Sequence, residues 1–449
     1  MSTLASSSPF ARSASLVKTH PFTTLASALL LVLGVAFCLR HDSEWDDVYL
    51  PAALHLWRGE DLYRIGESYL YPPFMAFAAL PFLTLPSPLP RLAWFALNAG
   101  CLVALLRWSW RVAGGGRLEG REVGKPTERL AAFLGCLCGM SYLENCLAHQ
   151  QTDIVIGALL AGGCLLLGRG RPLSAATALG LAAACKCTAL LWSPYLLWRG
   201  RPLAAIWLLV VAVGVNLSPD LVSSPAENGC WLGRYASRFL RPLTASNHYI
   251  GTWGSDAVYN QSLTGLAQRW CTTTWHWTAT DCTIEQRLPA IGPQTLRACV
   301  YGAELGLLAA VMWICGQPFR RLADDPDGSR YALECGMVLL LMVLLSPMSS
   351  KAHFGTLVLP GFCLARVALH SRGLLLKGVL AGAVLLGLLS NKDPLGERLY
   401  TLSLWYGVVT WQTLLLLAGC LTLYRKRRMA APLQLPCPTP GDGSASQAA

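Results

Sequence analysis

The chain has 449 residues, of which 53% are hydrophobic and only 14% are charged, and its formal net charge is +11. Soluble domains usually carry about 25% charged residues, so this composition excludes an ordinary soluble enzyme. The positive residues lie in short segments between apolar runs and near the C-terminus, which is typical of the cytoplasmic side of membrane proteins and does not indicate nucleic-acid binding.

Apolar runs suited to crossing a bilayer recur along the chain, and one span needs roughly 20 such residues. The first run, residues 21–39, is followed by Arg40 and acidic residues and not by a small-residue cleavage site, so we expect a retained helix. An acidic segment comes next. Residues 71–86 are apolar but interrupted by prolines, which predicts short interfacial helices on the outer face and not a full span.

The later apolar runs alternate between the two faces, because every basic cluster between them then falls on the cytoplasmic side. We expect these spans at about residues 89–110, 130–147, 154–167, 172–185, 188–198, 202–215, 294–315, 331–345, 355–370, 374–389 and 400–424. The prediction is an all-α polytopic membrane protein with about 12 transmembrane helices and both termini in the cytoplasm.

This topology divides the chain into a cytoplasmic N-terminal tail (1–20), a transmembrane domain (21–424) and a basic, then disordered, cytoplasmic tail (425–449). Within the domain, the first outer loop (41–88) carries the interfacial helices, and a long outer loop spans residues 216–293. The pairing of the cysteines in that long loop, Cys230, Cys271 and Cys282, is left open.

Polar residues from separate segments converge on the outer face of this topology, and polar groups at membrane depth are costly and usually functional. The candidate site residues are Asp46, Asp47, Tyr71, Gln151, Asp153, Lys186, Arg234, Arg238, Asn260, Arg269 and His353. A carboxylate beside apolar walls can act as a general base, and a lysine with arginines can bind a phosphate. A solvated acidic loop, a snorkelling lysine and a structural histidine are the alternative interpretations.

Asp46 and Asp47 are adjacent, so they point to different faces of a helix and we expect only one of them to act. The chain has no P-loop, GxSxG or HExxH motif and no CxxC pair with metal-ligand spacing. We therefore expect neither a metal nor a cofactor.

Short motifs in a fixed order carry a resemblance to a known family. In the first outer loop they are Asp46-Asp47-Val48-Tyr49, Ala52-Ala53, Gly59-Glu60-Asp61-Leu62-Tyr63 and Tyr71-Pro72-Pro73. Further along they are Gln151-Thr152-Asp153, Lys186 with Pro194, Asn260-Gln261-Ser262-Leu263 with Gly265, and Ser346-Pro347-Met348-Ser349 with His353. Together they resemble glycosyltransferase family 87 over about residues 30–370. Gln150 stands where this family has a glycine, and Ser350-Lys351-Ala352 before His353 also departs from its pattern.

The resemblance implies a C-type glycosyltransferase-like bundle in the cell (inner or plasma) membrane, serving the cell envelope. It implies transfer of a hexose, mannose in this family, from a polyprenyl-phosphate sugar to a hydroxyl of a lipid or glycan acceptor on the extracytoplasmic face. The transfer inverts the sugar and requires no metal. The general base falls on Asp46 or Asp47, while Lys186 and His353 handle the phosphate. Membrane lipids are expected partners and nucleic acid is not.

Two other functions compete with this one. A transporter or flippase of lipid-linked sugars would be expected to show internal repeats and broken helices near the midplane, and the sequence shows no internal repeat. A non-catalytic membrane assembly protein is the third hypothesis. Loss of sugar transfer on changing the first-loop aspartates distinguishes the enzyme from both.

Overall fold

The computed structural model describes most of the chain apart from its two tails and several loop segments. The predicted N-terminal tail (1–20) and the predicted disordered residues beyond Met429 lie outside the described residues. The described residues are 21–39, 43–64, 69–115, 125–225, 229–241, 257–271, 275–279, 282–286, 291–316, 318, 329–371 and 373–429.

Six helical segments within these ranges are long and apolar enough to cross a membrane. They are α5 (Leu89–Val112), α6 (Lys125–His149), α10 (Pro202–Leu217) with η4 (Ser218–Leu221), α14 (Pro293–Cys315), η7 (Lys351–Leu357) with α16 (Val358–His370), and α19 (Val408–Met429). A further pair, α17 (Leu374–Leu388) and α18 (Lys392–Trp405), meets the same test jointly but is bent by 89°, as in a broken span or a re-entrant loop.

Shorter, mostly apolar helices complete the bundle. They are α2 (Pro21–Leu39), α7 (Asp153–Gly168), α8 (Pro172–Cys185), η3 (Cys187–Leu191), α9 (Trp192–Trp198) and α15 (Ser329–Leu344). The chain is therefore a helical, multi-pass membrane protein, as predicted. The larger predicted number of spans depends on these shorter helices and stays a prediction.

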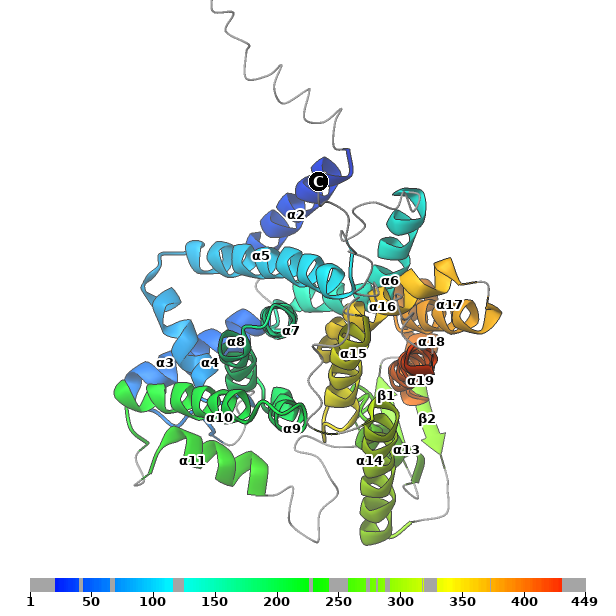
Figure 1. The fold of residues 1–449 in the computed structure, drawn as a ribbon. Coiled ribbons are helices and arrows are strands. Elements are labelled where there is room, and N and C mark those ends of the chain that lie inside the picture. The colour runs from blue at the N-terminus through cyan, green and yellow to red at the C-terminus, as the bar shows by residue number, and fades with distance from the viewer. Residues whose placement is uncertain are drawn as a thin grey trace, which may run out of the picture.

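The helices form two groups that meet along α15, α16 and η7 (Figure 1). In one group α5 packs on α7, α7 on α8, and α8 on α10. In the other, α6 packs on α16, and α17 on α19. The turn-like helix η7 contacts α6, α7 and α15, so it lies where the two groups adjoin.

The polarity of the bundle is that of a protein in lipid. Large apolar side chains face outward, with Trp313 85% and Leu203 76% exposed, while Arg269 and Gln412 are fully buried. Buried polar groups bond to one another: Arg199 and Tyr195 both donate to the Glu334 carboxylate inside the bundle. Burial of polar groups with their partners, and exposure of apolar ones, is the arrangement that a hydrocarbon surrounding favours.

The described residues of the predicted first outer loop (41–88) pack on the start of α5. Its described elements are the π-helix η1 (Trp45–Tyr49), α3 (Leu50–Arg58), α4 (Phe74–Ala79) and the 3-10 helix η2 (Leu80–Thr84). Short helices thus occur over the proline-interrupted segment, as predicted. Trp45 anchors the loop, since its ring stacks on Trp94 of α5 at 4.2 Å between centroids and meets Phe82 edge-on.

The structure adds one feature to the predicted all-α bundle and shifts one boundary. Within the long loop, for which the sequence predicts no secondary structure, β1 (Trp275–Ala279) and β2 (Cys282–Gln286) pair as an antiparallel hairpin, and aromatic and β-branched residues favour this state. After η4, the described helices of that loop are α11 (Trp231–Tyr235), the π-helix η5 (Ala236–Leu240) and α13 (Leu263–Cys271). The last span begins at Val408 and not at residue 400, because Gly407, with φ of 74°, separates it from α18. Cys230 and Cys271 are free thiols.

Candidate active site

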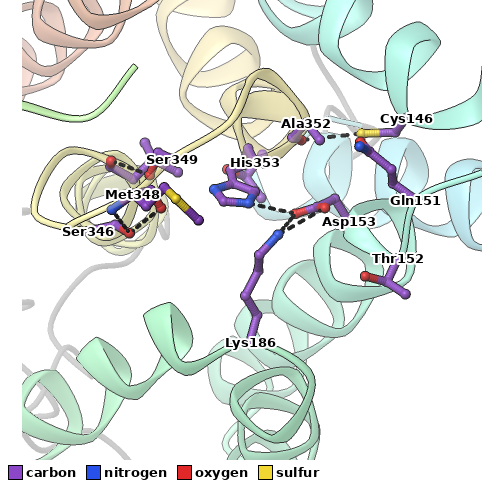
Figure 2. Close-up of polar contacts among 12 residues, drawn as sticks. Cys146, Gln151, Thr152, Asp153, Lys186, Ser346, Met348, Ser349, Ala352 and His353 are labelled. Carbon is purple, nitrogen blue, oxygen red and sulfur yellow. Dashed lines mark hydrogen bonds and ion pairs between the residues drawn. The ribbon is translucent and has the colours of Figure 1, made fainter. Parts of the chain in front are cut away.

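Three ionisable side chains from separate elements meet at one end of the α7–α8 hairpin (Figure 2). Asp153 begins α7, and Lys186 directly follows α8, so the return of the chain brings both to the same end. Lys186 Nζ lies 2.9 Å from Asp153 Oδ1 and 3.1 Å from Oδ2. His353, in η7, places Nε2 3.9 Å from the same Oδ1.

This Asp153–Lys186–His353 cluster is shielded but not sealed from solvent. The side chains are 7%, 15% and 9% exposed, respectively. Removing a charge from water is costly unless a partner compensates it, and each ion here compensates the other. Figure 2 shows Lys186 and His353 both directed at the Asp153 carboxylate.

The cluster retains unused hydrogen-bonding capacity. His353 Nδ1 and Gln151 Oε1 are buried and have no hydrogen-bond partner in the described part of the chain. Buried polar atoms are normally satisfied, so two unsatisfied atoms beside a buried ion pair indicate a place where a polar ligand binds.

A second polar cluster joins the first outer loop to the turn before α7. The Glu44 carboxylate accepts hydrogen bonds from Tyr71 Oη at 3.2 Å and Tyr49 Oη at 3.4 Å, and also from Gln151 Nε2. Tyr49 Oη in turn lies 3.3 Å from Thr152 Oγ1. Thus Glu44 and Tyr49 hold the two residues that precede Asp153.

Both tyrosines act as neutral donors at this site. Burial, followed by nearby groups that include the Glu44 carboxylate, raises the pKa of Tyr49 and of Tyr71 well above the ordinary value. Tyr71 also touches the first cluster, because Lys186 Nζ lies 5.5 Å from the centre of its ring. The structure therefore brings together five of the predicted residues: Tyr71, Gln151, Asp153, Lys186 and His353.

The carboxylates of the predicted first-loop aspartates, Asp46 and Asp47, form no hydrogen bond or ion pair with either polar cluster among the described residues. Asp46 Oδ1 accepts from Arg91 Nε at 2.9 Å, and Asp46 Oδ2 accepts from Ser43 Oγ at 2.7 Å. This pair fixes η1 to the start of α5, and both partners are largely buried. Asp47 is exposed.

The predicted basic residues of the long loop take different positions. Arg234, on α11, pairs with Asp61 of the first outer loop at 2.9 Å, and Arg238 is exposed on η5. Arg269 is fully buried, and its guanidinium donates to backbone carbonyls of Ala257 and Asn260.

Asn260 links the long loop to the turn that carries His353. Its Oδ1 accepts from Ser349 N at 3.1 Å and its Nδ2 donates to the Pro347 carbonyl at 3.2 Å. Gln261 N donates to the Ser349 carbonyl at 2.8 Å. These bonds fix the turn immediately before η7 and so position His353.

The sequence did not single out Glu44 as a site residue, and Tyr49, Thr152 and Ser349 appeared there only as members of the family motifs. Glu44 was visible only as one acid among several, and no spacing rule for α-helices would place it with Tyr49. Across the described ranges, no group of three or more His, Cys, Asp or Glu side chains is arranged to hold a metal ion.

One comparison with known protein families identifies the chain, and its matched range contains part of the polar cluster. The family model for glycosyltransferase family 87 matches residues 69–347, which is more than half of the chain and includes Tyr71, Gln151, Asp153 and Lys186. No curated protein and no solved structure matches the chain significantly. The chain belongs to glycosyltransferase family 87.

Proposed function

We propose that this glycosyltransferase moves a hexose, mannose by family resemblance, from a polyprenyl-phosphate sugar to an acceptor hydroxyl on the extracytoplasmic face, with inversion. The observation that carries the proposal is the buried Asp153–Lys186–His353 cluster with its unsatisfied polar atoms, in a chain of this family. The acceptor is a lipid or glycan, and the surrounding membrane lipids hold the donor's polyprenyl tail.

The proposed chemistry needs a cation and a hydrogen-bond donor for the leaving phosphate. Lys186 would supply the cation, and its ion pair with Asp153 keeps the ammonium in place until the donor arrives. His353 Nδ1, which has no hydrogen-bond partner among the described residues, would bond a phosphate oxygen or a sugar hydroxyl. Because the leaving group, polyprenyl phosphate, needs no protonation, a single carboxylate base in the first outer loop suffices, and the resemblance puts it at Asp46 or Asp47.

The remaining predicted residues would contribute at greater distance. Arg234 and Arg238 lie on α11 and η5 of the long loop, where they would meet the donor or acceptor as it enters. Arg269 and Asn260 would act through the scaffold that holds the His353 turn.

The proposed setting is the inner or plasma membrane of a cell with a glycosylated envelope. We propose about 12 spans, counting the shorter helices, with both termini cytoplasmic and the site extracytoplasmic. The transmembrane domain would cover residues 21–424, with outer loops at 41–88 and 216–293. α19 continues to Met429, so the last basic residues extend the final helix.

The alternative is a transporter or flippase of lipid-linked sugars. The observation that favours it is the 89° bend between α17 and α18, since discontinuous helices are common in transporters. The polar cluster favours the enzyme, because it lies at the end of the α7–α8 hairpin and not midway along it.

The test is a transfer assay with purified full-length protein in lipid vesicles. A panel of polyprenyl-phosphate sugars is supplied with membrane-extract acceptors, and the anomeric configuration of the product is determined. We expect a new glycosidic bond of inverted configuration with one donor. If intact lipid-linked sugar instead crosses the vesicle membrane and no new glycosidic bond forms, the protein is a flippase and not a transferase.

A further inference from the structure

The acidic first loop contains a carboxylate that is better placed than either aspartate. Glu44 is half-buried and bonds to Gln151, two residues before Asp153. Asp46 is held by Arg91 and Ser43, and Asp47 faces outward from the loop. Of these three acids, Glu44 is the one bonded to the residues of the Asp153–Lys186 end of the bundle.

The π-helix η1 explains why Glu44 reaches this position. Glu44 and Tyr49 are five residues apart, which is about 1.4 turns of an α-helix, so in an α-helix their side chains would point to different sides. In η1 the wider turn, closed by Leu50 N donating to the Trp45 carbonyl, returns Tyr49 to the side of Glu44. Single π-turns of this kind are frequent at functional sites.

The surroundings of Glu44 are arranged to orient a carboxylate. Tyr49, Tyr71 and Gln151 donate to its oxygens from three different segments, and among the described residues no ion pair joins Glu44 to a cation. Within the described ranges, Gln151 Oε1 is buried without a partner, although Gln151 Nε2 donates to Glu44. A ligand that donates to Gln151 Oε1 would therefore bind at the residue that holds the Glu44 carboxylate.

We infer that Glu44, and not Asp46 or Asp47, is the catalytic base that takes the proton of the acceptor hydroxyl. This inference rests on the proposed transfer reaction. The acceptor oxygen forms a bond to C1 of the sugar while the bond from C1 to the phosphate oxygen breaks. The electron pair of that bond leaves with the polyprenyl phosphate, beside Lys186, and the hydroxyl proton passes to the Glu44 carboxylate.

The first experiment compares matched variants of the full-length protein in vesicles with the active donor. Glu44→Gln keeps the size of the side chain but removes the base, so we expect kcat to fall by about 100- to 10,000-fold. Glu44→Asp keeps a carboxylate and recovers part of that loss. Glu60→Gln, an exposed acid of the same loop paired with His55, is the control and retains activity. The inference is overturned if Glu44→Gln folds and transfers sugar as fast as wild type, or if Glu44→Asp recovers none of the lost activity.

A second measurement separates a base from a merely structural residue. Azide is already anionic, so it attacks C1 without losing a proton. In Glu44→Ala, azide should therefore restore release of polyprenyl phosphate and yield a glycosyl azide. No glycosyl azide from a folded Glu44→Ala protein would contradict the base assignment. The two claims fail in different ways. If the wild-type protein transfers sugar from none of the donors, the proposed function is wrong. If wild type is active and Glu44→Gln is equally active, only the assignment of Glu44 is wrong.

Discussion

Lys186 contacts both carboxylate oxygens of Asp153, at 2.9 and 3.1 Å, although the two residues belong to opposite ends of a helical hairpin in sequence. Each is the charge that makes burial of the other tolerable. Such a pair can serve structure alone, or it can hold a cation ready for an anionic substrate. These two possibilities make different predictions for single and double variants.

Breaking the pair should lower stability, and restoring neutrality should recover stability without recovering activity. Lys186→Met removes the partner of the Asp153 carboxylate, which is only 7% exposed. We expect this to lower the free energy of unfolding by about 3–5 kcal/mol. The double variant Lys186→Met/Asp153→Asn removes both charges, so its thermal unfolding midpoint in detergent should return toward wild type. Its sugar transfer should stay at least 100-fold reduced, because the phosphate has lost its cation.

Lys392→Met is the control for this experiment. It breaks an ion pair with Glu397 in which the lysine is 63% exposed, so neither melting nor transfer should change measurably. A double variant that regained transfer together with stability would show that the pair is structural only.

Arg269 should behave as a structural residue and not as a phosphate ligand. Its guanidinium is fully buried against backbone carbonyls, including that of Asn260. Arg269→Gln leaves these carbonyls without donors and should reduce the yield of monodisperse protein in detergent, with little change in the donor KM of the fraction that folds. If Arg269→Gln is stable but has a strongly raised KM for the donor, Arg269 binds the donor phosphate after all.

The sequence predicted parts of this site for identifiable reasons. Asp153 and Lys186 were predicted at the same face because the basic residues between their two apolar runs mark the opposite face, but their ion pair was not predicted. The burial of Arg269 could not be predicted, since a buried arginine and a phosphate-binding arginine look alike in a single sequence. Glu44 was missed because helical spacing rules assume 3.6 residues per turn and η1 is a π-helix.

Gln150 should tolerate glycine but not a β-branched residue. Its φ is 55°, which is the left-handed region, and this accounts for the glycine that the family resemblance places there. A non-glycine residue in this conformation costs about 1–2 kcal/mol, and β-branched side chains suffer most. We expect Gln150→Gly to melt near the wild-type temperature and Gln150→Val to melt clearly lower. Equal melting of the two variants would contradict the strained turn.

Tyr71 should contribute through its hydroxyl as a neutral donor across the assay range. Burial raises its pKa, so the phenol stays protonated above the pH at which an exposed tyrosine would ionise, and it keeps donating to Glu44. A hydrogen bond to a charged group contributes about 1.5–3 kcal/mol, so Tyr71→Phe should reduce kcat by about 10- to 100-fold. Between about pH 8 and 10, ionisation of Tyr71 should therefore cause no decline in wild-type activity, because the raised pKa of Tyr71 lies above that interval. Wild type and Tyr71→Phe should have pH profiles of the same shape there.

Tyr331→Phe provides the matched control for this loss, since the Tyr331 hydroxyl donates to the Cys164 carbonyl in another part of the bundle. It should leave kcat unchanged even if it lowers the melting temperature slightly. If Tyr331→Phe and Tyr71→Phe lose activity equally, the effect comes from a general loosening of the helices. If only Tyr71→Phe loses activity, and its melting temperature stays close to that of wild type, the hydroxyl acts through the Glu44 carboxylate.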